Sequence, residues 1–148
     1  RLREQFGYVF EGARGYPATV ALAELPDRLM IGSIEISVAD QPHGSITSAG
    51  LRFEADGYAV GYATDINMMT EATRELYAGL DLWIVDGLRR APHPSHAHLD
   101  LTLAWIAEMV PRRAILTHMD QSMDYATLCA TLPPGVEPGF DGMEVELA

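Results

Sequence analysis

The fold is decided by the stretch from Leu82 to His118, which reads LWIVDGLRRAPHPSHAHLDLTLAWIAEMVPRRAILTH. Its first residues, Leu82–Val85, form a short apolar run typical of a buried strand, and Ala114–Thr117 form a second run of this kind. Between them, Leu99–Val110 carries apolar residues at helical spacing and is followed by Pro111, which stops a helix. A strand, a helix and a strand in this order predict an α/β layer structure.

On the amino-terminal side of this stretch, from Thr19 to Gly61, the apolar pattern mostly has a period of two residues. This pattern predicts strands at Ser33–Asp40 and at Tyr58–Ala63. The tripeptide Ala55-Asp56-Gly57 predicts a hairpin turn, with glycine placed for a positive φ. Phe6–Phe10 (FGYVF) reads like a further strand close to the start of the chain.

Two more helices and a last strand are expected around the same stretch. Thr70 can cap a helix that runs through about Ala78 and is ended by Gly79. Ser122 is expected to cap the last helix, which stops before Pro133, and Met143–Leu147 is expected to close the chain as a strand. Hairpins followed by alternating strands and helices predict a mixed sheet. We find no internal repeat and no linker, so residues 1–148 are interpreted as one domain.

Composition excludes several classes of partner. The formal charge of −11 leaves no basic stripe for nucleic acid, and no apolar run approaches the roughly 20 residues that span a membrane. The lone cysteine, Cys129, cannot form an internal disulfide, which fits the reducing cytoplasm, and its helical spacing predicts a packed core thiol. The charge also opposes a phosphate substrate at long range, although a bound divalent metal would reverse this locally.

Ionisable residues follow several of the expected strands. Asp65, Asp86 and His118 end apolar strands or lie just past them, and His43 follows the strand that ends at Asp40. A single residue of this kind is usually a capping or hydrogen-bonding group. His43, Asp65 and His118 together, projecting from one edge of the sheet, suit a divalent cation.

The sequence resembles the metallo-β-lactamase superfamily, and within it the branch of the phosphonate-pathway cyclic phosphodiesterase (phosphoribosyl 1,2-cyclic phosphate phosphodiesterase). The resemblance covers nearly the whole chain. It is densest in five segments: Tyr62–Asp65, Asp81–Asp86, His93–Leu103, Ile115–His118 and Pro138–Glu144. It implies the carboxy-terminal half of an αββα sandwich, with a mixed sheet carrying helices on one face.

The resemblance also implies roles for four residues. His43 matches a ligand of one metal, Asp65 matches the carboxylate that bridges two metals, and His118 matches a ligand of the second metal. His96 matches the histidine that protonates the leaving oxygen. The cofactors implied for the full-length protein are two divalent metal ions, Mn²⁺ or Zn²⁺, which clamp a phosphodiester and generate hydroxide for in-line attack.

The family's signature, His-x-His-x-Asp-His, is reproduced by His96–Asp100 in all but its last position, where Leu101 stands. In the family this motif directly follows an apolar strand and precedes the other ligands, whereas here it opens a helix and comes after Asp65. We therefore interpret it as the loop of His96 with a chance His98. Most of the metal-binding signature is then missing. Together with the lack of an initiator Met, this leads us to expect a chain cut from a longer protein.

The resulting hypothesis is a metal-dependent phosphodiesterase for a small, cyclic phosphate ester, inactive as this chain alone. Two alternatives stay open: a non-catalytic structural or interaction module of the same fold, and another hydrolase of the superfamily, for a thioester or a lactone. Half a sandwich would leave an apolar sheet face in water, so we also expect self-association or pairing with the missing amino-terminal half.

Overall fold

The computed structural model describes residues 2–147. Its strands form one seven-stranded sheet in the order β1-β2-β3-β4-β5-β6-β7. The neighbours from β1 to β4 are antiparallel, and those from β4 to β7 are parallel. The strands are β1 (Arg28–Ile31), β2 (Ile34–His43), β3 (Ile46–Ala55), β4 (Tyr58–Ala63), β5 (Leu82–Asp86), β6 (Arg113–Thr117) and β7 (Val136–Pro138). The prediction of an α/β fold with a mixed sheet is confirmed.

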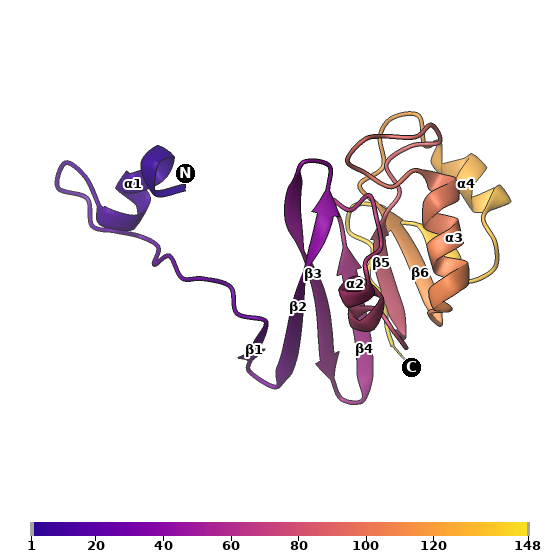
Figure 1. The fold of residues 1–148 in the computed structure, drawn as a ribbon, viewed down its shortest axis with the longest axis horizontal. Helices are drawn as coiled ribbons and strands as arrows, with labels where there is room; N and C mark the ends of the chain where they lie inside the picture. Colours follow the sequence, from indigo (N-terminus) through magenta and orange to yellow (C-terminus); the bar gives the residue numbers. More distant parts are fainter. Residues whose placement is uncertain (1, 148) are drawn as a thin grey trace.

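Three helices cover one face of this sheet (Figure 1). They are α2 (Glu71–Leu76), α3 (Leu99–Met109) and α4 (Tyr125–Thr131). Side chains alternate between the two faces of a strand, so Trp83 and Val85 of β5 turn toward the helices. They join one buried core with Trp105 of α3 and Leu128 of α4. The expected placement of helices on one face is confirmed.

The topology brings the ends of four strands to one edge of the sheet. Strands β2 and β4 run in the same direction because both are antiparallel to β3. Strands β5 and β6 follow that direction because they continue from β4 in parallel. The carboxyl ends of β2, β4, β5 and β6 therefore meet at one edge, where α/β proteins usually build their sites.

Local signals in the sequence located several elements correctly. The residues Asp56 (φ 53°) and Gly57 (φ 83°) form the two-residue turn of the expected hairpin between β3 and β4. Thr70 caps α2 as expected, although the helix ends at Leu76 rather than near Ala78. The expected strands in β5 and β6 and the expected helix at α3 agree with the structure to within one residue at each end.

The prediction of a strand at Phe6–Phe10 is wrong. These residues lie in helix α1 (Leu2–Glu11), which has a non-helical kink at Phe6. Phe6, Val9 and Phe10 are spaced three and four residues apart, which is also the spacing of one face of a helix. A run of only five residues is too short to distinguish the apolar period of a strand from that of a helix. Residues 18–27 have no regular structure, so the period-two pattern from Thr19 produces strands only from Arg28 onward.

Two predictions near the carboxyl terminus are also wrong. Met143–Leu147 has alternating apolar residues but forms no strand, and β7 at Val136–Pro138 takes the edge beside β6 instead. The last helix is capped by Asp124, whose carboxylate accepts a hydrogen bond from the amide of Thr127 (2.7 Å). Ser122 instead donates to the carboxylate of Asp120.

The expectation that Cys129 is a core thiol is wrong as well. Its side chain lies on the exposed surface of α4. Leu128 is the residue by which α4 is anchored in the core, and the next position is turned by about 100° around the helix axis.

The segment before β1 extends away from the sheet as an arm (Figure 1). It consists of α1 and residues 12–27, and Tyr8, Tyr16 and Leu25 are exposed on it. The sheet face opposite the helices carries alternating apolar residues such as Ile34, of which 38% is exposed. Within residues 2–147, no helix has the length and the apolar content to cross a membrane.

Candidate metal centre

His43 is the last residue of β2, which runs three residues further than the strand expected from the sequence. Its Nδ1 lies 2.8 Å from the backbone carbonyl of Ser95. A carbonyl oxygen only accepts hydrogen bonds, so Nδ1 carries the proton and Nε2 keeps a free lone pair. That arrangement is the usual one for a metal-binding histidine, whose second nitrogen is oriented by an outer partner.

Asp65 lies just past β4 and adopts a left-handed backbone with φ 57°. His118 follows β6 in the same way and has φ 60°. Non-glycine residues rarely take this conformation, and where they do they cluster at functional sites. In both residues the left-handed turn directly follows a strand of the parallel part of the sheet.

His96 lies in the loop between β5 and α3, where it contacts a buried carboxylate. Its Nδ1 is 2.8 Å from Oδ2 of Asp86, the last residue of β5. Asp86 is fully buried, and its pKa is raised by loss of solvation, an effect that the hydrogen bond from His96 opposes. This pairing fixes the imidazole and leaves Nε2 facing the site. The sequence interpretation of Asp86 as a hydrogen-bonding residue agrees with this geometry.

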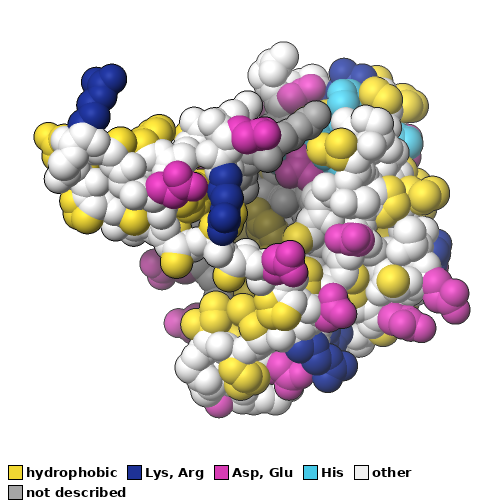
Figure 2. Space-filling view, turned by 60° about the vertical axis from the view of Figure 1, so that its left-hand side comes forward, with side chains coloured by type: hydrophobic (Ala, Val, Ile, Leu, Met, Phe, Trp, Pro, Cys, Tyr) yellow, Lys and Arg dark blue, Asp and Glu magenta, His cyan; other side chains and the backbone are white. Residues whose placement is uncertain are grey.

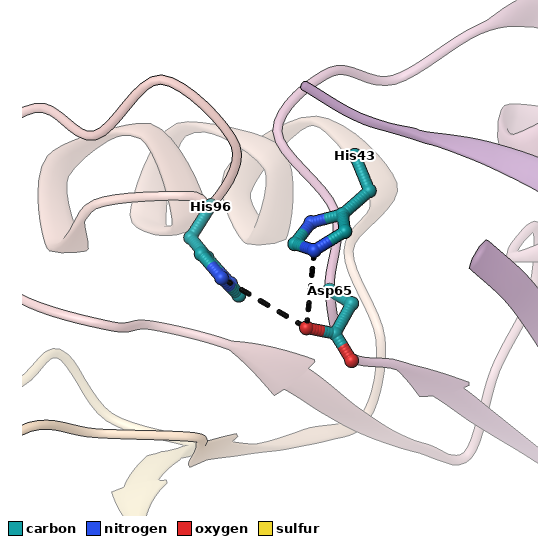
Figure 3. Close-up of side chains that lie close together, drawn as sticks. All are labelled: His43, Asp65 and His96. Atoms are coloured by element: carbon teal, nitrogen blue, oxygen red, sulfur yellow. Dashed lines mark ion pairs between the residues drawn. The ribbon is translucent and has the colours of Figure 1, made fainter. Parts of the chain in front are cut away.

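These side chains converge on a single oxygen atom. Oδ1 of Asp65 lies 3.6 Å from Nε2 of His43 and 3.8 Å from Nε2 of both His96 and His118. Figure 3 shows the imidazoles of His43 and His96 pointing toward Asp65 from two different segments of the chain. The rings also contact one another, because the imidazole of His96 stacks on that of His118 with centroids 4.8 Å apart.

The donor set fits a divalent metal. Two ligands of a tetrahedral Zn²⁺ ion, each about 2.1 Å from the metal, are about 3.4 Å from one another. The nitrogen–oxygen distances of 3.6 and 3.8 Å around Asp65 are close to that value. Within residues 2–147, His43, Asp65 and His96 offer three ligand atoms that all lie within 4.8 Å of one another, whereas the sequence assigned the metal to His43, Asp65 and His118. The structure thus places His96 in reach of either role, ligand or proton donor.

Two further histidines, His98 and His93, lie near these side chains in the sequence. His98 occupies the N-cap position of α3 but makes no side-chain capping bond there. The ring of His93 lies 5.0 Å from that of His96, and burial and the charge of Arg89 lower its pKa. In Figure 2, acidic side chains are scattered over the face in view, while histidines gather at its upper right edge.

Sequence reasoning missed residues that hold this site together. The side chain of Asn67 accepts from the amide of Gly44 (3.2 Å) and donates to the carbonyl of Pro94 (3.0 Å). It therefore joins the turn after His43 to the loop that carries His96. A polar residue in a loop gives no local signal for such a role, because both of its partners are distant in the sequence.

The chain was compared with known proteins. A family model described as the β-lactamase superfamily domain matches residues 1–119. The chain belongs to this family. Its members are metal-dependent hydrolases, and the resemblance of the sequence to the superfamily is thereby confirmed. No curated protein matches the chain.

Solved structures of this superfamily share the fold. A diphosphatase of the PhnP family has a TM-score of 0.83 and 24% identity, over 96% of this chain and 52% of that one. Zn²⁺-bound PqqB from Methylobacterium extorquens has a TM-score of 0.69 and 17% identity, over 95% and 60%. YhfI from Bacillus subtilis, a metallo-β-lactamase fold protein, has a TM-score of 0.69 and 18% identity, over 92% and 58%. The chain spans about half to three fifths of the length of these structures.

Proposed function

We propose that this chain carries part of the active site of a phosphodiesterase that hydrolyses a small, cyclic phosphate ester. The observation that carries the proposal is the convergence of three Nε2 atoms on one oxygen of Asp65. The diphosphatase of the PhnP family, which has the same fold, supports phosphate chemistry rather than thioester or lactone hydrolysis.

In this proposal His43, Asp65 and His118 hold two divalent metal ions, Mn²⁺ or Zn²⁺, together with ligands from outside the chain. When bound, the ions polarise the phosphate and lower the pKa of a bound water. The free Nε2 of His43 and the exposed carboxylate of Asp65 both face the position that such ions need. The excess of negative charge on the chain opposes an anionic substrate, and bound cations would reverse this field locally.

His96 supplies the proton in the same proposal. Asp86 accepts a hydrogen bond from Nδ1 of His96, which orients Nε2, the nitrogen that would carry the transferred proton, toward the site. From there the proton can pass to the oxygen that leaves the phosphorus atom. Asp86 is shielded from water, so this oriented pair is held in one arrangement.

The missing ligands and the open sheet face lead to the proposed partners. The face opposite the helices exposes apolar residues of β2 and β4, including Ile34 and Tyr62. We propose that a second sheet covers it, from a second copy of the chain or from the remainder of a longer protein. The single cysteine leads us to place the protein in the cytoplasm.

Metal content measured by elemental analysis tests the proposal, after purification with Mn²⁺ and Zn²⁺ supplied. About two ions per chain, as in a two-metal site, are expected if a partner copy completes the ligands. Exchanging His43→Ala should lower this content, whereas His98→Ala should not, because the histidines that approach Asp65 within residues 2–147 are His43, His96 and His118. Hydrolysis of bis(p-nitrophenyl) phosphate should follow the metal content.

Other outcomes of this experiment are equally clear. Equal loss of metal in the His43 and His98 variants would overturn the assignment of the site. Bound metal without phosphodiester hydrolysis would favour a thioester or lactone substrate, which a substrate panel would identify. A chain that binds no metal, even when mixed with the rest of its parent protein, would favour the non-catalytic module.

A further inference from the structure

Gln41 is a fully buried polar residue on β2, two positions before His43. Its Nε2 donates to the hydroxyl of Ser48 on β3 (2.9 Å) and to the backbone carbonyl of Thr64. The opposite orientation of the amide would set its oxygen against the carbonyl of Thr64, so these bonds fix which end is nitrogen. A buried amide is costly unless it is hydrogen-bonded, and this one uses both of its ends.

The bonds continue from Gln41 to the backbone of Asp65. The Ser48 hydroxyl accepts from Gln41 and donates to the backbone carbonyl of Asp65 (2.8 Å). Two successive carbonyls, those of Thr64 and Asp65, are thus held by side chains of β2 and β3. These are the carbonyls on either side of the Asp65 Cα, where the backbone takes its left-handed conformation.

Tyr77 closes the network from the helix side. Its hydroxyl lies 3.0 Å from Oε1 of Gln41 and 3.0 Å from the carbonyl of Tyr62. Gly50 makes room for it, because a Cβ on Gly50 would lie 2.3 Å from the Tyr77 hydroxyl and 2.8 Å from Oε1 of Gln41. A residue without a side chain is therefore needed at this position of β3, next to the hydroxyl of Tyr77.

We propose that Gln41, Ser48 and Tyr77 are positioning residues that hold Asp65 in the geometry needed to bind metal. The inference rests on the proposed metal centre and deepens it. Because Gln41 and His43 belong to the same strand, the network also sets the distance between His43 and Asp65. Without it, the left-handed turn at Asp65 would lose the two bonds that oppose its relaxation.

Two substitutions break the network with little change in volume. Gln41→Leu removes the buried amide, and Tyr77→Phe removes only the hydroxyl. Thr73→Val is the matched control, because Thr73 is also fully buried but the hydrogen bonds of its hydroxyl go to Met69 and Thr70 and not to Gln41, Ser48 or Tyr77. All of the variants should lose some stability in urea unfolding, so stability alone does not separate them.

Zn²⁺ affinity, measured by competition with a chromophoric chelator, separates positioning from simple stability. Gln41→Leu is expected to bind Zn²⁺ about 10–100-fold more weakly, as outer-shell variants of metal sites do. Tyr77→Phe should also bind Zn²⁺ more weakly than the unsubstituted chain. The double variant should bind Zn²⁺ no more weakly than Gln41→Leu, because both substitutions break the same network. Thr73→Val should bind as the unsubstituted chain does. Equal affinity in Gln41→Leu and the unsubstituted chain would overturn the inference and leave the metal centre intact.

A second measurement needs no metal. The scalar coupling between the amide and α protons of Asp65, measured by NMR, depends on φ. It should change in Gln41→Leu and stay unchanged in Thr73→Val. If the unsubstituted chain binds no Zn²⁺, the proposed metal centre fails for this chain, and the coupling still decides the inference: a left-handed Asp65 that persists in Gln41→Leu overturns it.

Discussion

At the scale of single residues, the carboxylate of Asp86 stands out because its burial is unfavourable. The side chain is fully buried, and its Oδ1 has no hydrogen-bond partner in residues 2–147. Loss of solvation raises its pKa, although the hydrogen bond from His96 works against that shift. The carboxylate that orients His96 is therefore held at a cost in folding free energy.

Replacement of Asp86 by Asn should separate stability from activity. The free energy of unfolding at pH 7 is expected to stay level or rise, because a buried carboxyl group whose charged form is disfavoured by loss of solvation is removed. Phosphodiester hydrolysis should fall by up to about 10⁴-fold, as in hydrolases whose orienting carboxylate becomes an amide. Because the pKa of Asp86 is raised in the folded state, the negative charge of Asp86 destabilises the folded state only at pH values above the ordinary carboxyl pKa. The stability of Asp86→Asn relative to the unsubstituted chain should thus increase as the pH rises through the carboxyl range, in urea unfolding between pH 3 and 8.

Asp81, just before the same strand, is the matched control with the opposite sign. Its carboxylate accepts from the amide of Ala59 (2.8 Å) and pairs with Arg112, and the bond to Ala59 is the main cause of its lowered pKa. A lowered pKa stabilises the fold above the ordinary carboxyl pKa, and this stability is lost as the pH falls through the lowered value. Asp81→Asn should therefore destabilise the protein at pH 7. Parallel pH profiles for the two Asn variants would refute this account.

At the scale of elements, α2 depends on its first turn. Thr70 accepts from the amide of Thr73, and the Thr73 hydroxyl accepts from the amide of Thr70, which is a reciprocal capping box. The helix has only six residues, so this first turn is a large part of it.

Thr70→Ala is accordingly expected to lower the free energy of unfolding by about 1 kcal/mol. Thr131→Ala, the same exchange in α4, should change it by less than about 0.5 kcal/mol, because Thr131 is exposed and bonds only to the carbonyl of Thr127 one turn earlier. Urea unfolding of both variants checks the difference. Equal losses would mean that the capping box contributes nothing specific to α2.

The elements also show how far the sequence could predict the structure. The Asp56-Gly57 turn, the Thr70 cap and strand β5 were predictable because their signals lie within a few residues of the element itself. Met143–Leu147 has the alternating pattern of a strand but pairs with no strand of the sheet. Whether a segment finds a pairing partner depends on the rest of the sheet. Pattern gives the tendency of a segment, whereas its pairing is decided by the whole fold.

The same division holds for the site. His43, Asp65 and His118 could be predicted to share one edge because each follows an expected strand. Their approach to a single carboxylate oxygen, and the contact of His96 with Asp86, became visible only in three dimensions. Gln41 was not predicted because its partners lie on β3, just after β4 and just after α2, and no spacing in the sequence joins them.

At the scale of the whole molecule, helices cover only one of the two faces of the sheet. Arg52 of β3 donates to the carbonyls of Leu76 and Ala78, at the end of α2 and just past it, so its neighbour Phe53 lies on the opposite face of the sheet. There Phe53 shares a hollow with Ile34 and Val60. A contiguous apolar surface of this kind usually marks an interface. This chain covers 52% and 60% of two of the matched structures, so those proteins contain further structure that this chain does not match.

Self-association through this face is therefore the expected behaviour of the 16.2 kDa chain in the absence of another partner. Light scattering should give a mass above that of the monomer. Ile34→Arg should return it to the monomer mass, because a symmetric contact would bring the two introduced charges close together. Tyr125→Arg is the control, since Tyr125 is a comparably exposed apolar residue on α4, on the helix-covered face. An unsubstituted chain that is monomeric and binds no hydrophobic dye would contradict the assignment of this sheet face as an interface. Its apolar side chains would then be stable in water without a partner. A mass that falls equally in both variants would place the contact elsewhere on the molecule.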